Sequence, residues 1–239
     1  MSVWNVVIGC VTASFVNAAV IRAQKNQDYV FSRSYCPVCG HVLSFVDMLP
    51  VIGYLIRKGK CHYCGCNISL RYPVTEIIGG VRALLSRNIY DFALYMILLA
   101  VSLYDSDTMA IRNRYLIMLI MLSCFLVDLN YINDHLLGSV IISVPMYIIA
   151  ITTKGFGCGD VKLMAVCGFL LGWERAILSF VLSCMTGSVY ALYLMIRKKA
   201  GMKSEMPFGP FLAMGIRISW RYGFRLIDFY EFLFIRVYN

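Results

Sequence analysis

Long apolar stretches alternate with short basic segments along most of the chain, and this alternation predicts a series of membrane helices. The apolar stretches cover approximately residues 3–22, 73–89, 91–104, 114–131, 135–153, 161–173, 175–196 and 207–220. Several are shorter than the ~20 residues that usually cross a hydrocarbon core of ~30 Å, but short or broken helices are tolerated where neighbouring helices shelter them. The pattern predicts an all-α, polytopic membrane protein with about eight transmembrane helices.

The composition agrees with this prediction. Hydrophobic residues make up 60% of the chain, charged residues make up 15%, and the mean hydropathy is +0.72, which is too apolar for an ordinary soluble protein. The first apolar stretch has no basic residue before it, whereas Arg22 and Lys25 follow it. A secretory signal has the opposite arrangement, so we interpret residues 1–22 as the first transmembrane helix.

The net charge of +9 indicates membrane topology rather than nucleic-acid binding. Most basic residues lie in polar segments between apolar stretches. The positive-inside rule places these segments in the cytosol. The bias is imperfect, and the basic residues near the C-terminus fit it least well: Arg217, Arg221, Arg225 and Arg236. We expect a lipid bilayer as the surroundings of the protein and no nucleic-acid partner.

The polar segment 23–72 divides the chain into three expected parts. Residues 1–22 form the first transmembrane helix, residues 23–72 form a cytosolic loop, and residues 73–239 form a multi-helix membrane domain. The loop contains two Cys-x-x-Cys motifs, "CPVCG" and "CHYCG", whose cysteines are Cys36, Cys39, Cys61 and Cys64. This paired spacing is typical of tetrahedral Zn²⁺ coordination by thiolates.

A zinc ion would also give the loop a reason to fold, because the free energy of metal binding becomes free energy of folding in a segment with little apolar core. Structural disulfides are rare in a reducing cytosol, which favours metal binding over cystine formation. The ligand set stays open at this point, because Cys66 and His62 lie beside the second motif. Four incidental cysteines are the alternative interpretation.

Two aspartates stand at the ends of apolar runs. Asp105 closes one run, Asp160 opens another in "GFGCGDVKL", and two expected helices lie between them, so both return to the cytosolic face. Ionisable groups at membrane depth are costly and therefore indicate function. If the carboxyl groups meet, one can activate water while the other, protonated, polarises a carbonyl, which is general acid–base hydrolysis of a peptide bond. Asp107 is a rival to Asp105.

The residues around Asp160 allow two interpretations. Gly157 and Gly159 permit a sharp bend and a close approach to a substrate strand, but Asp160 could equally be the N-cap of a helix. Lys162 could orient substrate or hold a carboxylate ionised, although a lysine just inside a membrane helix more often snorkels towards the headgroups. Glu76 is either a functional buried acid or an acid favoured by a helix N-terminus. We expect His135 to lie in a solvated loop.

Four ordered motifs make the chain similar to the type IV prepilin peptidases, the leader peptidase/N-methyltransferases of type IV pilus and type II secretion systems. These motifs are "ASFVNAAVIR", the four-cysteine loop followed by "ISLRYPVTEIIGG", the aspartate motif "GCGDVKL", and a late "MPFGPFLAMG". The resemblance covers nearly the whole chain. The chain departs from the family after the first aspartate, where "AIRNR" replaces a Leu-Pro-Asp-like turn. The intervals between Arg22 and Cys36 and between Asp105 and Asp160 are also shorter than is usual in the family.

The resemblance implies a membrane aspartic protease of the bacterial inner membrane. "LYDSD" matches the family's first aspartate at Asp105, and "GCGDVKL" matches the second at Asp160. The implied substrates are prepilins or pseudopilins with a short basic leader, which are cut at the cytosolic membrane surface. The resemblance further implies N-methylation of the new amino terminus from S-adenosylmethionine, and Gly59 and Lys60 match a loop associated with that transfer.

Two other classes of function are compatible with parts of the sequence. Membrane aspartates also serve proton-coupled transporters, which hold them near the midplane of repeated halves. A four-cysteine loop can also belong to a membrane interaction module without enzymatic activity. Neither alternative explains two aspartates at helix ends on one face of the membrane.

Overall fold

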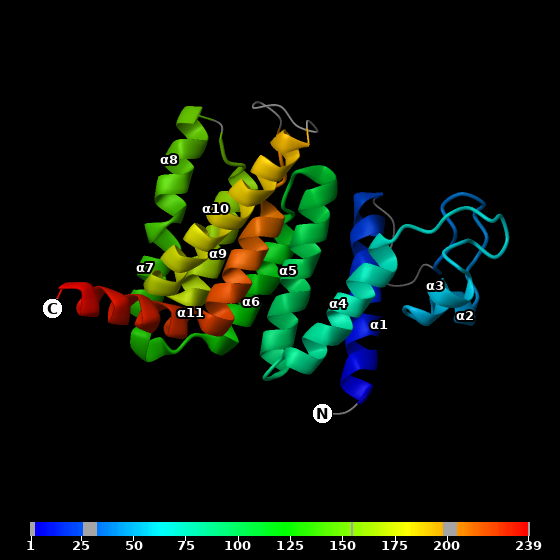
Figure 1. The fold of residues 1–239 in the computed structure, drawn as a ribbon, viewed down its shortest axis with the longest axis horizontal. Coiled ribbons are helices and arrows are strands. Elements are labelled where there is room, and N and C mark those ends of the chain that lie inside the picture. Colours follow the sequence, from blue (N-terminus) through cyan, green and yellow to red (C-terminus); the bar gives the residue numbers. More distant parts are fainter. Residues whose placement is uncertain (1–2, 26–32, 154, 198–204, 239) are drawn as a thin grey trace. The chain divides into compact units, whose positions relative to one another are not determined.

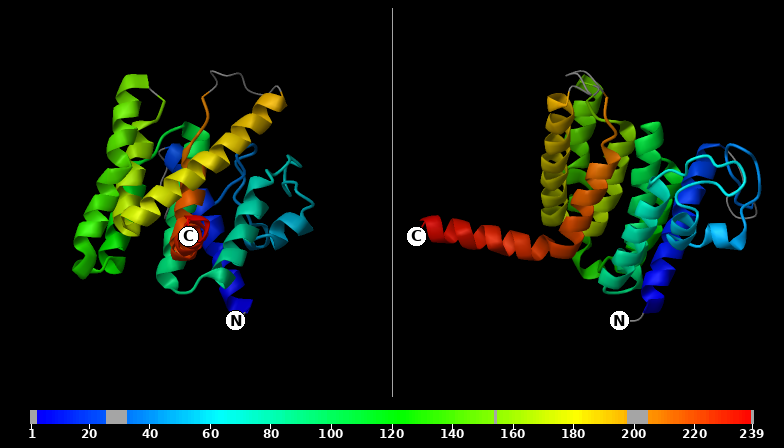
Figure 2. Two further views of the ribbon diagram at one scale, coloured as in Figure 1. Left: turned by 60° about the vertical axis from the view of Figure 1, so that its left-hand side comes forward. Right: turned by 45° about the vertical axis from the view of Figure 1, so that its right-hand side comes forward.

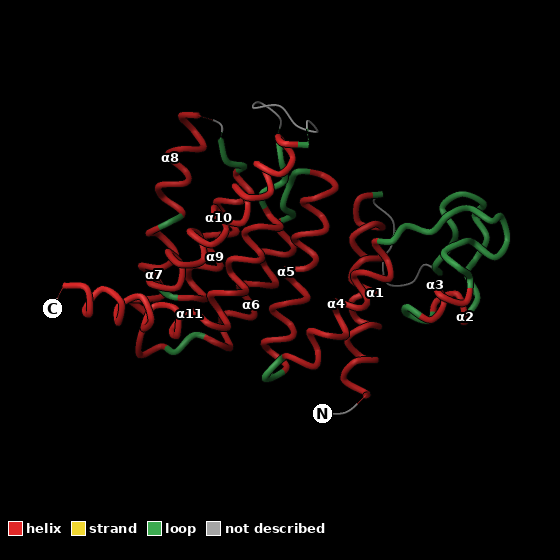
Figure 3. Tube along the Cα trace, viewed as in Figure 1, coloured by secondary structure: helices red, strands yellow, loops and turns green. Residues whose placement is uncertain are grey.

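All regular secondary structure in the computed structural model is helical over the described residues 3–25, 33–153, 155–197 and 205–238 (Figure 3). Isolated bridges join Tyr35 to Val42 and Lys60 to Asn67. The contacts divide the chain into two compact units, Met1–Met96 and Ile97–Asn239. The prediction of an all-α protein is confirmed.

The first unit contains two packed helices and the cysteine-containing loop (Figure 1). Helix α1 is Val3–Gln24 and α4 is Arg71–Leu85, while the short helices α2 (Phe45–Met48) and α3 (Ile52–Ile56) lie in the loop. Glycines permit the close contact of α1 with α4, because a Cβ at Gly79 would overlap the side chain of Ala13. Small residues at such a contact are typical of packed membrane helices.

The second unit is a helical bundle. It contains the end of α5 (Ile89–Thr108) and the elements α6 (Asn113–Leu126), η1 (Leu129–Tyr131), α7 (Ile132–Ile141), α8 (Ser143–Thr153), α9 (Cys158–Leu171), α10 (Trp173–Ile196) and α11 (Gly209–Tyr238). Helix α9 is the centre of this bundle, since it contacts α6, α7, α8, α10 and α11. Its side chains are buried on several sides, as the apolar sequence around the whole helix requires.

Four helical segments are long and apolar enough to cross a membrane: Val3–Gln24, Ile89–Thr108, Leu129–Thr153 and Trp173–Ile196. Helix α6 is apolar but shorter. Many large apolar side chains on these segments are exposed in the protein alone, as expected for surfaces that face lipid. The structure therefore supports a membrane protein with four long apolar helices and several shorter ones.

Some expected boundaries were wrong. The stretch 135–153 is divided at Ile142 into α7 and α8, and the last helix continues to Tyr238 instead of ending near residue 220. The expectation that His135 lies in a solvated loop was also wrong. His135 belongs to α7, which begins at Ile132, and it is buried. Its Nδ1 lies 2.7 Å from the carbonyl oxygen of Phe169 in α9. A periodic apolar pattern does not show where one helix stops and the next begins.

Candidate active site and metal-binding loop

Asp105 is a buried carboxylate in the last turn of α5, and α11 begins directly against it. Its side chain is only 4% exposed. The backbone N–H of Gly209, the first residue of α11, donates a 2.8 Å hydrogen bond to Asp105 Oδ2. A Cβ on Gly209 would lie 2.7 Å from the same oxygen, so only glycine allows this approach without a shift of either helix.

Asp160 lies at the same end of the second unit, in the first turn of α9. Of the two interpretations of Asp160, that of a helix N-cap is wrong: the N-cap is Gly157, α9 begins at Cys158, and Asp160 is its third residue. This position still favours a carboxylate, because unpaired N–H groups and the positive end of the helix dipole are nearby. Asp160 is 8% exposed, and its Oδ1 atom is buried without a hydrogen-bond partner among the described residues.

The structure places the two carboxylates near each other. Asp105 and Asp160 lie close enough to interact electrostatically, although α6, η1, α7 and α8 separate them in sequence. Asp107 differs from Asp105 in its surroundings, because it is exposed whereas Asp105 is buried. Two residues along an α-helix differ in direction by about 200°, which explains how neighbours in "DSD" come to face opposite environments.

The glycines of the aspartate motif have different roles. A Cβ on Gly159 would lie 3.0 Å from the Cβ of Ile111, so this glycine lets the start of α9 approach the segment after α5. Gly157 has the extended backbone of an N-cap residue, and a Cβ there would be 3.3 Å from Asp160 Oδ2. Lys162 is exposed, as expected for a lysine that extends towards headgroups or solvent.

Aromatic side chains adjoin the segments that carry the aspartates. Phe156 lies three residues before the pair Gly159–Asp160, and its ring contacts those of Phe208 and Phe180. Phe208 immediately precedes Gly209 and also contacts Phe211. An apolar segment of a substrate could contact these rings while its backbone meets the carboxylates.

The two cysteine motifs of the first unit fold into matching turns. In the first, Cys36 N–H donates to His41 and Gly40 N–H donates to Cys36; in the second, Cys61 N–H donates to Cys66 and Gly65 N–H donates to Cys61. Gly40 and Gly65 have φ values of +71° and +70°, which glycine adopts without strain. The sequence similarity of the two motifs therefore reflects one shared backbone geometry.

The four motif cysteines fit a single metal ion. The sulfur atoms of Cys36, Cys39, Cys61 and Cys64 all lie within 4.8 Å of one another. Four thiolates around one Zn²⁺ would place their sulfurs about 3.8 Å apart, given Zn–S bonds of about 2.3 Å, and Cys36 Sγ lies 3.9 Å from Cys64 Sγ. Cys66 Sγ is 3.6 Å from Cys36 Sγ but does not belong to this group of four.

Backbone N–H groups prepare two of these sulfurs for the thiolate form. The N–H groups of Cys39 and Val38 lower the pKa of the Cys36 thiol to about 6. The N–H groups of Cys64 and Tyr63 likewise lower the pKa of Cys61. Because metals bind thiolates rather than thiols, each turn presents one cysteine that favours metal binding.

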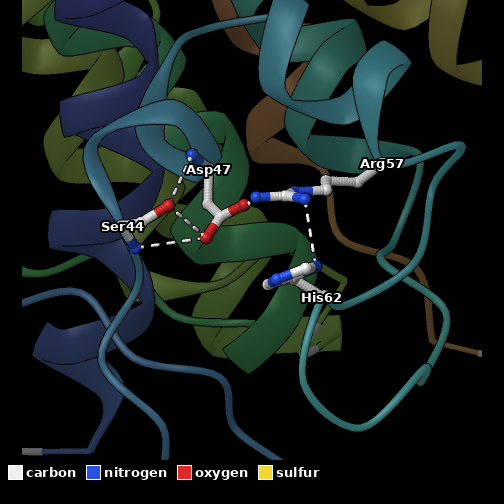
Figure 4. A network of polar contacts seen from close by, with 4 residues as sticks. All are labelled: Ser44, Asp47, Arg57 and His62. Atoms are coloured by element: carbon white, nitrogen blue, oxygen red, sulfur yellow. Dashed lines mark hydrogen bonds and ion pairs between the residues drawn. The ribbon is translucent and has the colours of Figure 1, made fainter.

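A polar network supports the segment between the two cysteine turns (Figure 4). Ser44 and Asp47 form a capping box at the start of α2, and Arg57 Nε donates a 2.6 Å hydrogen bond to Asp47 Oδ1. Arg57 Nη1 also lies 3.0 Å from His62 Nδ1. His62 is thus held by Arg57 and is not part of the group of four sulfurs that could hold a metal ion.

Gly59 and Lys60 lie just before the second cysteine turn. Gly59 has φ +71°, and a Cβ on it would lie 2.7 Å from the hydroxyl oxygen of Tyr54. Its carbonyl accepts a 2.7 Å hydrogen bond from Ile68 N–H. Lys60 is exposed, so its ammonium group is accessible from outside the loop.

Glu76 joins three segments of the first unit. It is 6% exposed, its Oε1 accepts a 2.6 Å hydrogen bond from the Ser14 hydroxyl, and its Oε2 accepts a 2.7 Å bond from Val51 N–H. Val51 has φ +61°, a strained value for a β-branched residue. The interpretation of Glu76 as an acid at a helix N-terminus misses this role, since its partners lie far away in sequence.

Gly209 is the site residue that sequence reasoning did not single out. The family resemblance includes "PFGP" within "MPFGPFLAMG", but it does not show that this segment contacts an aspartate more than a hundred residues earlier. The sequence did contain a signal, which is a glycine directly before a proline at a helix start. The glycine allows another group to approach the backbone closely, and the proline presets a helical φ.

Comparison with known proteins gives one family. Residues 7–89 match the bacterial peptidase A24 N-terminal domain, and residues 92–192 match the type IV leader peptidase family. A prepilin leader peptidase/N-methyltransferase of Bacillus subtilis is 30% identical and covers 94% of this chain and 95% of its own length. Proteins with the same name from Pseudomonas putida and Aeromonas salmonicida are 29% and 26% identical, over 81% and 83% of this chain and 74% of their own lengths. No solved structure matches the chain.

We predict that Glu76→Ala destabilises the first unit by about 1–3 kcal/mol, because Val51 N–H and the Ser14 hydroxyl, both half-buried, would then lose their acceptor. Glu76→Gln keeps one acceptor oxygen and should lose less. Thermal unfolding of the detergent-solubilised protein measures the difference. The exposed Glu174→Ala serves as the control and should change stability by less than about 0.5 kcal/mol. Equal unfolding temperatures for Glu76→Ala and Glu174→Ala would contradict the role of Glu76.

Proposed function

Because the chain belongs to the type IV leader peptidase family, we propose that it is a prepilin leader peptidase that also N-methylates the amino terminus it creates. The observation that supports the peptidase activity is that Asp105 and Asp160 are both buried and lie near each other at one end of the second unit. Two such carboxylates favour sharing a single proton, which is the arrangement that aspartic proteases use.

The proposed chemistry divides acid and base between the pair. The ionised carboxylate takes a proton from a water molecule, whose oxygen attacks the carbonyl carbon of the scissile peptide bond, while the protonated carboxyl group donates a hydrogen bond to the carbonyl oxygen. The C–N bond then breaks, and the leaving nitrogen receives a proton. We assign no individual acid and base, because two interacting carboxyl groups titrate as a unit.

The surroundings give the two aspartates different tasks in positioning. Asp105 is held by the Gly209 N–H, so one of its oxygens is fixed. Asp160 Oδ1 has no hydrogen-bond partner in the described part of the chain, and in our proposal this oxygen contacts the water or the substrate carbonyl. The rings of Phe156 and Phe208 would then contact the apolar side chains that follow the cleavage point.

We propose prepilins or pseudopilins as substrates and the bacterial cytoplasmic membrane as the location. The basic residues of the sequence favour a cytosolic position for the loop 23–72 and for the end of the bundle that carries Asp105 and Asp160. A prepilin with a basic cytosolic leader and an apolar membrane helix would present its junction at this surface. A proton-coupled transporter is less well supported, because both aspartates lie in terminal turns of helices rather than at mid-helix.

We assign methyl transfer to the first unit. Cys36, Cys39, Cys61 and Cys64 would hold a structural Zn²⁺, which ties the two cysteine turns together and thereby fixes Gly59 and Lys60 next to the second turn. S-adenosylmethionine is the proposed methyl donor: it would supply a methyl group to the new terminal amine, which would release a proton, and S-adenosylhomocysteine would be left. The exposed Lys60 is our candidate for contact with the reactants.

We predict that Asp105→Asn and Asp160→Asn each lower the rate of prepilin cleavage by about 10²–10⁴-fold, the usual contribution of general acid–base catalysis. The amide is nearly isosteric with the carboxyl group but cannot exchange the proton. Mass spectrometry of a model prepilin incubated with the detergent-solubilised protein measures cleavage. Asp107→Asn is the matched control and should cleave normally; full activity in either of the other two variants rules out the paired mechanism.

We predict that Gly209→Ala lowers cleavage by about 10²-fold, because its methyl group would displace the Asp105 carboxylate, and misplacement by about 1 Å has effects of this size. The same substitution at Gly223, in the middle of α11, where a Cβ would meet the flexible side chain of Arg175 instead of an aspartate, is the control. Thermal unfolding of both variants separates a local effect from loss of the fold. If the two variants cleave equally well, Gly209 does not position Asp105.

We predict that the purified protein holds about one zinc ion per chain, and that Cys36→Ser and Cys61→Ser remove it. Both variants should lose methylation of cleaved prepilin while retaining cleavage, since the cysteines and the aspartates belong to different units. Elemental analysis and product mass measure the two effects, with the exposed Cys158→Ser as the control. Normal methylation by a zinc-free variant would show that methyl transfer does not require the metal.

A further inference from the structure

The last helix contains two parts with different surroundings. From Gly209 to Ser219, α11 packs in the bundle, and Leu212, Ile216 and Ser219 are fully buried. From Phe224 onwards nearly all described side chains are exposed. Figure 2 shows that this end of α11 turns away from the direction of the bundle helices and projects sideways from them. Despite its 30 residues, α11 is not among the helices apolar enough to cross a membrane.

The turn of α11 is fixed by Arg175 in the first turn of α10. The Ser219 hydroxyl donates a 2.7 Å hydrogen bond to the Arg175 carbonyl oxygen. The Arg175 guanidinium lies 4.5 Å from the ring centre of Phe224 and 5.9 Å from that of Trp220, distances at which cation–π attraction is effective. The projecting part is therefore attached to the bundle at a defined point.

This attachment point lies at the end of the bundle away from the aspartates. Helix α11 starts against Asp105 and runs the length of the bundle before it reaches Arg175, and α9 runs from Asp160 to the residues that directly precede α10. The projecting part of α11 therefore leaves the bundle near the opposite surface of the membrane. A helix that projects sideways at this level lies along the membrane rather than through it.

The exposed part of α11 separates polar from apolar side chains. Arg221, Arg225, Asp228 and Glu231 follow one another at spacings of four, three and three residues, which places them on one face of a helix.

The opposite face is apolar. Tyr222, Leu226, Phe229 and Leu233 follow at spacings of four, three and four residues, and all four are exposed. Phe224 and Phe232 are exceptions, since both fall among the polar positions, and Phe224 contacts the Arg175 guanidinium. This pattern is typical of a helix at a membrane surface.

We propose that Arg221–Leu233 is an interfacial helix that lies in the bilayer surface opposite the paired aspartates. The apolar face contacts acyl chains, and Arg221 and Arg225 bind lipid phosphate groups, whose negative charge complements them. This arrangement also accounts for two of the C-terminal arginines that fit the positive-inside rule poorly: Arg221 and Arg225 are held at the headgroups by the helix and do not report the side of a loop. The proposal does not depend on the peptidase activity.

Tryptophan quenching in reconstituted vesicles tests this position. The full-length protein with Trp4, Trp173 and Trp220 changed to Phe is the background, and Leu226→Trp and Asp228→Trp each add one tryptophan on opposite faces of α11. Vesicles of phosphatidylcholine and phosphatidylglycerol carry bromine on the acyl chains or contain no bromine. We expect brominated lipid to quench Leu226→Trp at least about twice as strongly as Asp228→Trp, and aqueous iodide to show the reverse order.

Equal strong quenching of both tryptophans by iodide would overturn the proposal, because the helix would then extend into water. Equal quenching of both by brominated lipid would also overturn it, because a helix within the hydrocarbon does not separate the two faces. Protection of Leu226→Trp from both quenchers that disappears on dilution with lipid would assign the apolar face to a second protein copy instead. Leu233→Trp and Glu231→Trp form a second matched pair if either first variant fails to fold.

Discussion

The structure depends on burying two neighbouring carboxylates where little water is available to solvate them. A buried carboxylate needs hydrogen-bond donors or a shared proton, and helix ends offer backbone donors here. Asp105 receives a backbone N–H from the first residue of α11, and Asp160 stands in the first turn of α9. Backbone donors suit this task because they carry no charge of their own and cannot rotate away. The end of α5 and the starts of α9 and α11 approach one another closely. This close approach explains why positions 159 and 209 are glycines, since a Cβ at either position would crowd a neighbour.

The first unit solves a different problem, which is to order a polar segment without an apolar core. Two equivalent turns bring four sulfurs within range of one ion, and the contact between the rings of His41 and Tyr63, 3.5 Å apart, joins the turns independently of a metal. Glu76 then connects this loop to α1 and α4 through Ser14 and Val51. A four-cysteine group that could hold a metal, a ring contact and one buried acid thus take the place of the hydrophobic packing that orders the second unit, and none of these depends on the aspartates.

Much of this arrangement could be predicted from sequence, and the failures have physical causes. The helical class, the four-cysteine group and the choice of Asp105 and Asp160 follow from periodicity, spacing and family motifs. The division of α7 from α8 could not be read, because the apolar pattern continues through Ile142. His135 was misplaced because its partner, the Phe169 carbonyl, is a backbone atom that leaves no mark in the sequence. Gly209 was missed for the same reason: its contribution is an N–H group that every residue except proline has, and only the fold shows that it points at Asp105.

Helix α11 links the two surfaces of the second unit. Its first residue contacts Asp105, and Ser219 and Phe224 contact Arg175 near the opposite end. A rigid helix held at both ends transmits position: any movement of its far end along the membrane normal would move Gly209 relative to Asp105. The amphipathic part of α11, which follows the contact with Arg175, would resist such movement. Displacement would take apolar side chains out of the acyl region or arginines into it. The depth of the aspartates is then set from the opposite surface of the membrane, which gives a structural reason for a long, mixed-polarity tail after the last packed residue.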